Sequence, residues 1–125
     1  MGTSYKGYSP VYRAVGDNIK RVATVFDYKN GFFGNNSSHG RKSTRNIIAN
    51  DVIAVAKDFY EKITYGGLER KINDNMKITR MADGTIITIR KVSHSDGTPA
   101  IDINITKSVD AGGLKTQKIH CVKEK

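Results

Sequence analysis

Isoleucine and polar residues alternate in three successive segments of the last third of the chain, Thr85–Val92, Ala100–Thr106 and Lys115–Val122. Successive side chains of a β-strand point to opposite faces, so this period of two predicts three strands with one apolar face. The residues expected on the apolar face are Ile87, Ile89, Ile101, Ile103, Ile105, Ile119 and Cys121. The residues expected on the polar face are Thr88, Arg90, Asp102, Asn104, Thr116, Lys118 and His120.

A different spacing precedes these strands. Apolar residues recur every three or four positions between Asp51 and Tyr65, which predicts an amphipathic helix. Asn50 is the expected N-cap, Asp51 suits the positive end of the helix dipole, and Gly66-Gly67 supplies a C-terminal stop. The stripe that should pack on the isoleucine face comprises Val52, Val55, Ala56, Phe59 and Ile63.

A fourth strand is expected over 75–81, with Met76 and Ile78 facing inward and Ala82-Asp83-Gly84 turning the chain into the next strand. Short loops favour sequential antiparallel pairing. The pattern therefore predicts an α+β fold in which an irregular or helical N-terminal part and one main helix pack on a four-stranded antiparallel sheet. The other face of this sheet is expected to be at least partly open to solvent.

The first part of the chain shows no clear periodicity. Val22–Phe26 is expected to form a short strand or a helical turn, and Asn30–Lys42 has the composition of a long loop. We therefore expect residues 1–30 to be an N-terminal extension or linker and residues 31–125 to form the functional domain.

Charge narrows the expected partners. The 125 residues include 21 Lys and Arg against 12 Asp and Glu, which gives a formal net charge of +9. An excess of positive charge of this size favours binding to a polyanion. A nucleic acid is the leading expected partner, ahead of an anionic membrane or an acidic protein. No apolar run approaches the length of a membrane span, and no signal peptide is recognisable. Cys121 is the single cysteine, which excludes an internal disulfide, and it is expected to be a small thiol in the core.

The sequence lacks the motifs of several common functional sites. There is no Gly-rich phosphate loop with its lysine, no paired-cysteine motif and no His-Glu-x-x-His. His39, His94 and His120 are far apart and few carboxylates accompany them, so neither a metal site nor another cofactor is expected. Ser93–Asp96 resembles a hairpin turn more than a hydrolase triad.

The polar face of the predicted strands provides most of the groups that metal-free cleavage of RNA requires. The 2′-hydroxyl of RNA is its own nucleophile, so the protein supplies proton transfer, for which histidine is suited, and positive charge against the phosphate. The polar residues of this face are also common on any exposed strand. Asp102 could simply be such a surface residue, or it could orient a neighbouring histidine or lysine. The candidate catalytic residues are His120, Lys118, Arg90, Thr116 and Thr88.

A second basic cluster precedes the predicted helix, whose N-terminus would favour phosphate. Its members are His39, Arg41, Lys42 and Arg45, and Lys91 and Asn104 complete the expected substrate-binding set. The same cluster could equally be a flexible basic loop that only adds affinity.

Several short motifs occur in order between Asn30 and Val122. They are Ala56–Ile63 leading into Tyr65-Gly66-Gly67, Met81–Thr88, Ser95–Pro99, Asp102–Ile105 and Thr116–His120. Together they resemble the C-terminal toxin domains of bacterial polymorphic toxins, including LXG-type exported toxins and contact-dependent growth inhibition proteins. The resemblance implies a nuclease of the barnase–EndoU–colicin–RelE-like group, with a helical part followed by a four-stranded sheet that carries the site.

The resemblance also implies a biological setting. The domain would be secreted or delivered from the cell surface as the C-terminal part of a larger protein, act in the cytoplasm of a rival cell, and be neutralised in the producer by a cognate immunity protein. That partner is expected to be acidic, and the need for a host translation factor stays open. Only Lys118 and His120 carry over by matching motif, and Cys121 stands where a bulky apolar residue is expected.

The leading hypothesis is thus a metal-independent ribonuclease toxin, an endonuclease with tRNA as its expected substrate. One alternative is a metal-dependent DNase toxin, although its ligands are not evident in the sequence. The other is a non-enzymatic basic RNA-binding module, although the outward residues of the predicted strands include no aromatic side chain on which bases could stack.

Overall fold

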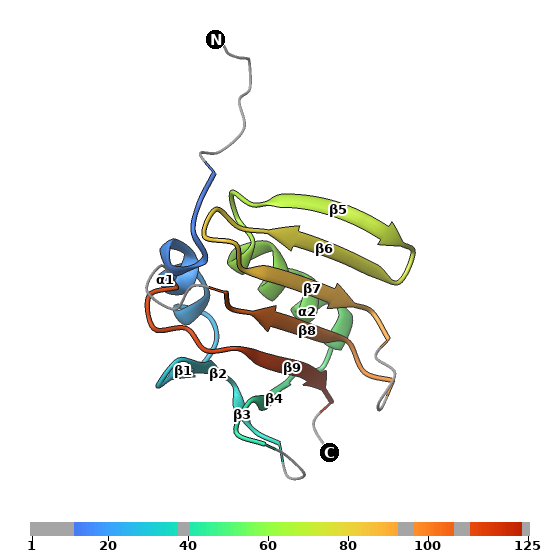
Figure 1. Cartoon of the computed structure of the whole chain (residues 1–125). Coiled ribbons are helices and arrows are strands. Elements are labelled where there is room, and N and C mark those ends of the chain that lie inside the picture. The colour runs from blue at the N-terminus through green and yellow to red at the C-terminus, as the bar shows by residue number, and fades with distance from the viewer. Residues whose placement is uncertain (1–11, 38–40, 93–96, 107–110, 124–125) are drawn as a thin grey trace.

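The computed structural model describes residues 12–37, 41–92, 97–106 and 111–123. Its ordered elements begin with a 3-10 turn, η1 (Val15–Asn18), and a short helix, α1 (Ile19–Ala23). The main helix is α2 (Val52–Ile63). Both helices lie on the same side of a large twisted sheet, and the side that faces the viewer in Figure 1 carries no helix. The expected α+β class is confirmed.

The sheet is larger than the four strands expected. Seven strands are hydrogen-bonded in the order β3-β4-β9-β8-β7-β6-β5. A separate hairpin pairs two further strands, β1 (Tyr28–Lys29) and β2 (Phe32–Phe33). The strands of the main sheet are β3 (Asn35–Asn36), β4 (Thr44–Ile48), β5 (Leu68–Asn73), β6 (Met76–Arg80), β7 (Ile86–Arg90), β8 (Ala100–Asn104) and β9 (Gln117–Val122).

Sequential antiparallel pairing holds from β5 to β9. The strands that were not expected lie on either side of the four expected ones, β6 to β9. β5 adds a strand beside β6, and β4 pairs parallel with β9 and carries the short strand β3 at its other side. β9, the last strand of the chain, therefore occupies an interior position in the sheet.

The core lies between the sheet and α2, which contacts β7, β8 and β9. Ile87, Ile101 and Ile119 are among the buried side chains that the alternation predicted. Phe59 of α2 is fully buried and meets Phe26 and Phe33 edge-on, with ring centroids 5.3 and 5.1 Å apart. Burial of this apolar surface provides the main drive for folding.

Two local expectations were wrong. The N-cap of α2 is Asp51, whose carboxylate accepts a hydrogen bond from the Ala54 amide at 3.1 Å, so Asn50 lies one residue outside the helix. In β6 the inward residue is Thr79, which pairs laterally with buried Ile87. Met76 and Ile78 therefore face the side without helices, because an error of one residue exchanges the two faces of a strand.

The segment before residue 30 contributes to the core. Val15, Asn18 and Val22 are fully buried. The Asn18 side-chain amide donates to the carbonyl oxygens of Ile63 and Tyr65 at 2.9 and 2.8 Å, which ties η1 to the end of α2. Residues 15–22 thus belong to the packed domain, and composition alone did not reveal this.

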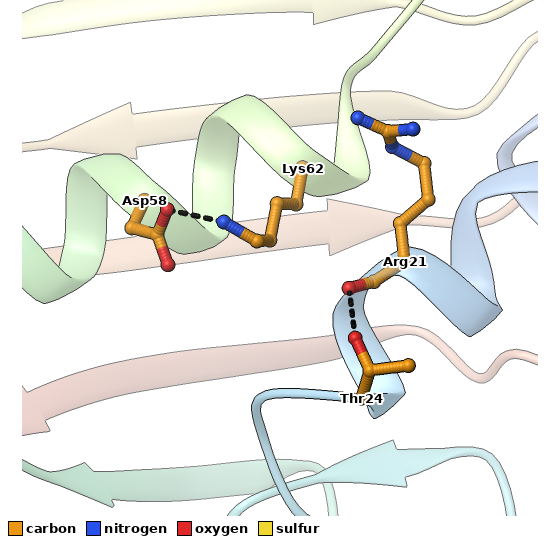
Figure 2. A network of polar contacts seen from close by, with 4 residues as sticks. All are labelled: Arg21, Thr24, Asp58 and Lys62. Atoms are coloured by element: carbon orange, nitrogen blue, oxygen red, sulfur yellow. Dashed lines mark hydrogen bonds and ion pairs between the residues drawn. The ribbon is translucent and has the colours of Figure 1, made fainter.

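The outer surface of the helical layer carries local polar contacts. In α2, Lys62 forms an ion pair with Asp58 one turn earlier. At the end of α1, the Thr24 hydroxyl donates to the Arg21 carbonyl at 3.0 Å (Figure 2). Such exposed contacts stabilise helix ends by small amounts. These residues lie on the helical side of the sheet, away from the face described next.

Candidate functional site

The side of the sheet without helices brings together the central residues of the candidate catalytic set. Across β9, β8 and β7 one row contains His120, Ala100 and Arg90, and the next row contains Lys118, Asp102 and Thr88. Adjacent strands lie about 4.8 Å apart, so the backbones of His120 and Arg90 are roughly 10 Å from each other. We refer to Thr88, Arg90, Asp102, Lys118 and His120 as the open-face cluster.

Alternation along β9 explains why His120 belongs to this face. Its neighbours Ile119 and Cys121 are fully buried on the helical side. His120 itself is only 6% exposed. Its Nδ1 lies 3.0 Å from the Thr98 hydroxyl oxygen, a contact that fixes the plane of the ring. The sequence predicted the direction of this side chain but neither its depth nor its contact with Thr98.

Arg90 is held by an acidic neighbour on the adjacent strand. Its Nη1 donates to the Asp102 carboxylate at 3.0 Å, and both side chains remain about one third exposed. This pair adds little stability at such exposure, but it limits the positions that the guanidinium can occupy. Lys118 lies directly opposite Asp102 on β9. The two cations of the cluster therefore flank one carboxylate.

The other strand-face candidates lie farther from His120. Thr116 is exposed, and its hydroxyl oxygen accepts a hydrogen bond from the Ile105 amide at 3.0 Å. Asn104 is exposed at the far end of β8, opposite Ile86. Lys91 follows β7 and lines a groove beside α2. Thr116 and Asn104 thus border the open-face cluster, whereas Lys91 belongs to a different surface.

The basic cluster before α2 has a different setting from the one expected. Strand β4 separates Arg41 and Lys42 from the start of the helix, so these residues do not lie at its N-terminus. Both are exposed. Arg45 lies within β4 and is 8% exposed. His39 lies outside the described residues, as do His94 and Ser93–Asp96.

The Arg45 guanidinium holds the loop that joins β2 to β3. Nε donates to the Phe33 carbonyl at 2.9 Å, and Nη2 donates to the Gly34 carbonyl at 2.8 Å. Nη1 donates to the Asn36 side chain and to the Lys42 carbonyl. These four contacts give Arg45 a structural role, and none of them supports its predicted role in substrate binding.

Arg45 also forms part of a basic hollow that the sequence did not predict. This hollow has a volume of about 450 Å³. Its lining comprises Lys29, Asn30, Phe32, Asn36, Lys42, Arg45 and Lys115. We call this set the basic hollow. The turn at Asn30-Gly31 brings Lys29 and Phe32 into it, and an Asn-Gly pair between short apolar runs is a strong hairpin signal that the loop composition obscured.

A larger groove, of about 490 Å³, lies between α2 and the β5–β6 hairpin. Its charges are mixed. Lys57, Lys71, Lys77 and Lys91 line it together with Glu61, Glu69 and Asp74. Two ion pairs, Lys71 with Asp74 and Lys77 with Glu69, connect these groups within the groove. The groove therefore has a less cationic lining than the basic hollow.

Cys121 is a buried free thiol, as expected. Burial raises its pKa from the ordinary value of 9.0 to about 11, so the thiol is protonated near neutral pH. Within the described ranges, no group of three or more His, Cys, Asp or Glu side chains is placed to hold a metal ion. No helix among the described residues is long and apolar enough to cross a membrane.

Comparison of the chain with protein-family models, with curated proteins and with solved structures found no match to any of them.

Proposed function

We propose that this protein is a metal-independent ribonuclease that uses the open-face cluster to cleave RNA. The observation that carries the proposal is the placement of one imidazole, one ammonium and one guanidinium on the helix-free face, within adjacent rows of three neighbouring strands. Such groups suit a phosphodiester, whose negative charge increases during cleavage.

The reaction requires few groups from the protein. His120 takes the proton of the 2′-hydroxyl, and the 2′-oxygen then attacks the adjacent phosphorus. The bond between phosphorus and the 5′-oxygen breaks, and solvent protonates the departing oxygen, which leaves one product with a 5′-hydroxyl. The second product ends in a 2′,3′-cyclic phosphate. Lys118 and Arg90 place positive charge against the phosphate oxygens, and Thr88 supplies a hydroxyl donor. General base catalysis of this kind contributes about 10²–10⁴ in rate.

The environment of His120 suits a positioned base. The contact with Thr98 fixes the imidazole plane through Nδ1. Its low exposure requires the 2′-hydroxyl to approach closely, which favours an unpaired nucleotide that can leave its stack over a nucleotide inside a duplex. This is consistent with cleavage in a loop of a structured RNA such as tRNA.

The resemblance to polymorphic toxin domains adds the biological part of the proposal. The chain would act in the cytoplasm of a target bacterium and be neutralised in the producing cell by an acidic immunity protein. Its sheet would then be an enlarged form of the four-stranded sheet of the barnase–EndoU–colicin–RelE-like group. An acidic partner that covers the open-face cluster would associate rapidly by electrostatic steering.

The experiment compares purified wild-type protein with His120→Asn and with a charge control, on labelled tRNA in EDTA. His120→Asn keeps a polar side chain of similar size but cannot act as a base near neutral pH, so cleavage should fall by about 100-fold or more. Lys118→Ala should reduce cleavage strongly, whereas Lys77→Ala, which removes the same charge from an exposed site, should not. The wild-type products should carry cyclic phosphate ends.

Three outcomes would contradict the proposal. Cleavage by His120→Asn at the wild-type rate, with its fold verified by circular dichroism, would remove His120 from the reaction. Cleavage of DNA only when magnesium is present would favour the metal-dependent DNase. Salt-dependent binding of RNA that stays intact would favour a non-enzymatic binding module.

A further inference from the structure

The charged side chains that line the basic hollow are all of one sign, unlike those of the larger groove beside α2. Four of its lining residues are cationic, namely Lys29, Lys42, Arg45 and Lys115, and none of the described residues that line it is acidic. No ion pair within the described part of the chain involves any of these four side chains. In the larger groove beside α2, by contrast, lysines are paired with carboxylates.

Arg45 makes this charge difficult to neutralise internally. Its guanidinium is nearly buried, and its four hydrogen-bond acceptors are three backbone carbonyl oxygens and one side-chain amide oxygen. All four are neutral groups, so they satisfy the donors without cancelling the positive charge. A cation in partly desolvated surroundings interacts more strongly with an anion than one in water does.

The topology assembles the other members of the basic hollow. Because β4 and β9 run parallel, their N-terminal ends lie at the same end of the sheet, where Lys42 precedes β4 and Lys115 precedes β9. The Lys115 amide donates to the Gly31 carbonyl at 3.1 Å, which attaches the β1–β2 turn at this point. A Cβ atom on Gly31 would lie 2.6 Å from the Lys115 side chain, so glycine permits this close approach.

Phe32 adds an aromatic wall to the basic hollow. The Arg45 guanidinium lies over its ring, 5.2 Å from the centroid. Grooves that bind single-stranded nucleic acid combine cations for the phosphates with aromatic rings on which bases stack. The basic hollow supplies both, whereas the open-face cluster contains no Phe, Tyr or Trp.

We infer that the basic hollow is a phosphate-binding subsite for a single-stranded nucleic acid, in which Lys29, Lys42 and Lys115 contact the backbone and Phe32 stacks against a base. The subsite is separate from the open-face cluster. Arg45 lies on the helical face of β4, whereas its neighbour Thr44 shares the open face with Lys118. Lys115 precedes Lys118 by three residues, roughly 10 Å along an extended chain. A bound strand can therefore pass around this end of the sheet toward the cluster.

The inference rests on the proposed function for the identity of its RNA ligand, but its test does not depend on cleavage. The probe is a fluorescent single-stranded DNA of roughly 12 nucleotides, which lacks the 2′-hydroxyl used in the proposed reaction. Its affinity for the full chain is measured by anisotropy over a series of salt concentrations. Lys29, Lys42 and Lys115 are replaced together by alanine. The charge-matched control replaces Lys57, Lys71 and Lys77 of the larger groove.

Loss of three phosphate contacts should reduce the slope of log affinity against log salt by about 2, since each contact to a single strand contributes about 0.7. The control triple variant should retain most of the wild-type slope. Phe32→Leu should weaken binding of the oligonucleotide by about fivefold or more, and should leave binding of inorganic pyrophosphate unchanged.

Equal slopes for the wild type and the basic-hollow variant would overturn the inference. Equal losses in the two triple variants would also overturn it, because the affinity would then come from diffuse charge. Circular dichroism and thermal unfolding confirm that each variant is folded. A protein that binds through the basic hollow but never cleaves RNA would refute the proposed reaction and leave this subsite standing.

Discussion

Replacing Arg45 by methionine distinguishes a structural role for this side chain from a role in holding substrate. Methionine retains an unbranched apolar stem but cannot donate hydrogen bonds. The change therefore removes three hydrogen bonds that attach β4 to residues 33–36 and a fourth to the Lys42 carbonyl. The carbonyl oxygen of Phe33 would lose its partner in a buried position.

The expected loss of stability follows from these contacts. A hydrogen bond from a charged donor contributes about 1.5–3 kcal/mol, and an acceptor left unpaired in the interior costs about 1–3 kcal/mol. Only the contact with Phe33 is fully buried, and the other three are partly accessible, so water can replace Arg45 there at lower cost. We expect the free energy of unfolding to fall by about 3 kcal/mol. A domain of ordinary stability, about 5–15 kcal/mol, remains folded after such a loss.

Urea unfolding followed by circular dichroism measures this change. The midpoint should fall while the dependence on urea stays constant, since the surface exposed on unfolding is nearly the same. Lys42→Met is the matched control, because it makes a similar substitution at an exposed position of the same basic hollow and should change stability by no more than about 0.5 kcal/mol. A loss below about 1 kcal/mol for Arg45→Met, accompanied by weak nucleic-acid binding, would refute the structural role.

Three further changes test other parts of the structure. Gly31→Ala should lower the free energy of unfolding, measured in urea, by at least about 1–2 kcal/mol. The reason is that φ at this position is +88° and the new Cβ would lie 2.5 Å from the Gly113 carbonyl oxygen. Unchanged stability would show that the turn is placed differently. Asp51→Ala should cost about 1 kcal/mol through loss of the α2 cap, and Asp51→Asn, which can still accept the hydrogen bond, should restore most of it. Burial raises the pKa of Cys121 to about 11 and that of Tyr60 to about 12. Both groups stay protonated in the folded state at pH values where they ionise in the unfolded chain, so the free energy of unfolding should fall between pH 9 and 12. Tyr60→Phe should make this fall smaller. A pH dependence of stability identical to that of the wild type would contradict the burial of the Tyr60 hydroxyl.

The sequence was most informative where one face of an element is apolar. Ile87 and Ile89 alternate with Thr88 and Arg90 in β7 because the first pair packs against α2 and the second does not. The same contrast identified β8, β9 and the helix, and it placed His120 on the open face. Periodicity predicts such elements because it records which side chains leave water.

The elements that were missed lack this contrast. All six residues of β5 are exposed, Leu68 and Ile72 included, so no buried face gives this strand an apolar stripe. In β4 the buried positions are Arg45 and Ile47. A hydropathy pattern assigns an arginine to the surface, so the buried face of this strand could not be recognised. Parallel pairing of β4 with β9 depends on contacts about seventy residues apart, which no local pattern encodes.

The geometry of the candidate site could be predicted only in part, for the same reason. The direction of Lys118 and Arg90 follows from alternation, whereas the contact of His120 with Thr98 depends on how the hairpin between β7 and β8 closes. The basic hollow was missed because its lysines come from three separate segments, which only the packing of the β1–β2 turn against Lys115 brings together.

The interior position of β9 has a consequence for the order of events during translation. Residues 117–122 are synthesised after the other strands of the described sheet, yet they join β4 on one side to β8 on the other. Until they are synthesised, no strand joins β3–β4 to β5–β8 in the sheet, and the open-face cluster lacks Lys118 and His120. Under the proposed function, a nascent chain stalled before residue 117 would carry most of the basic residues but lack Lys118 and His120, and we expect it not to cleave RNA.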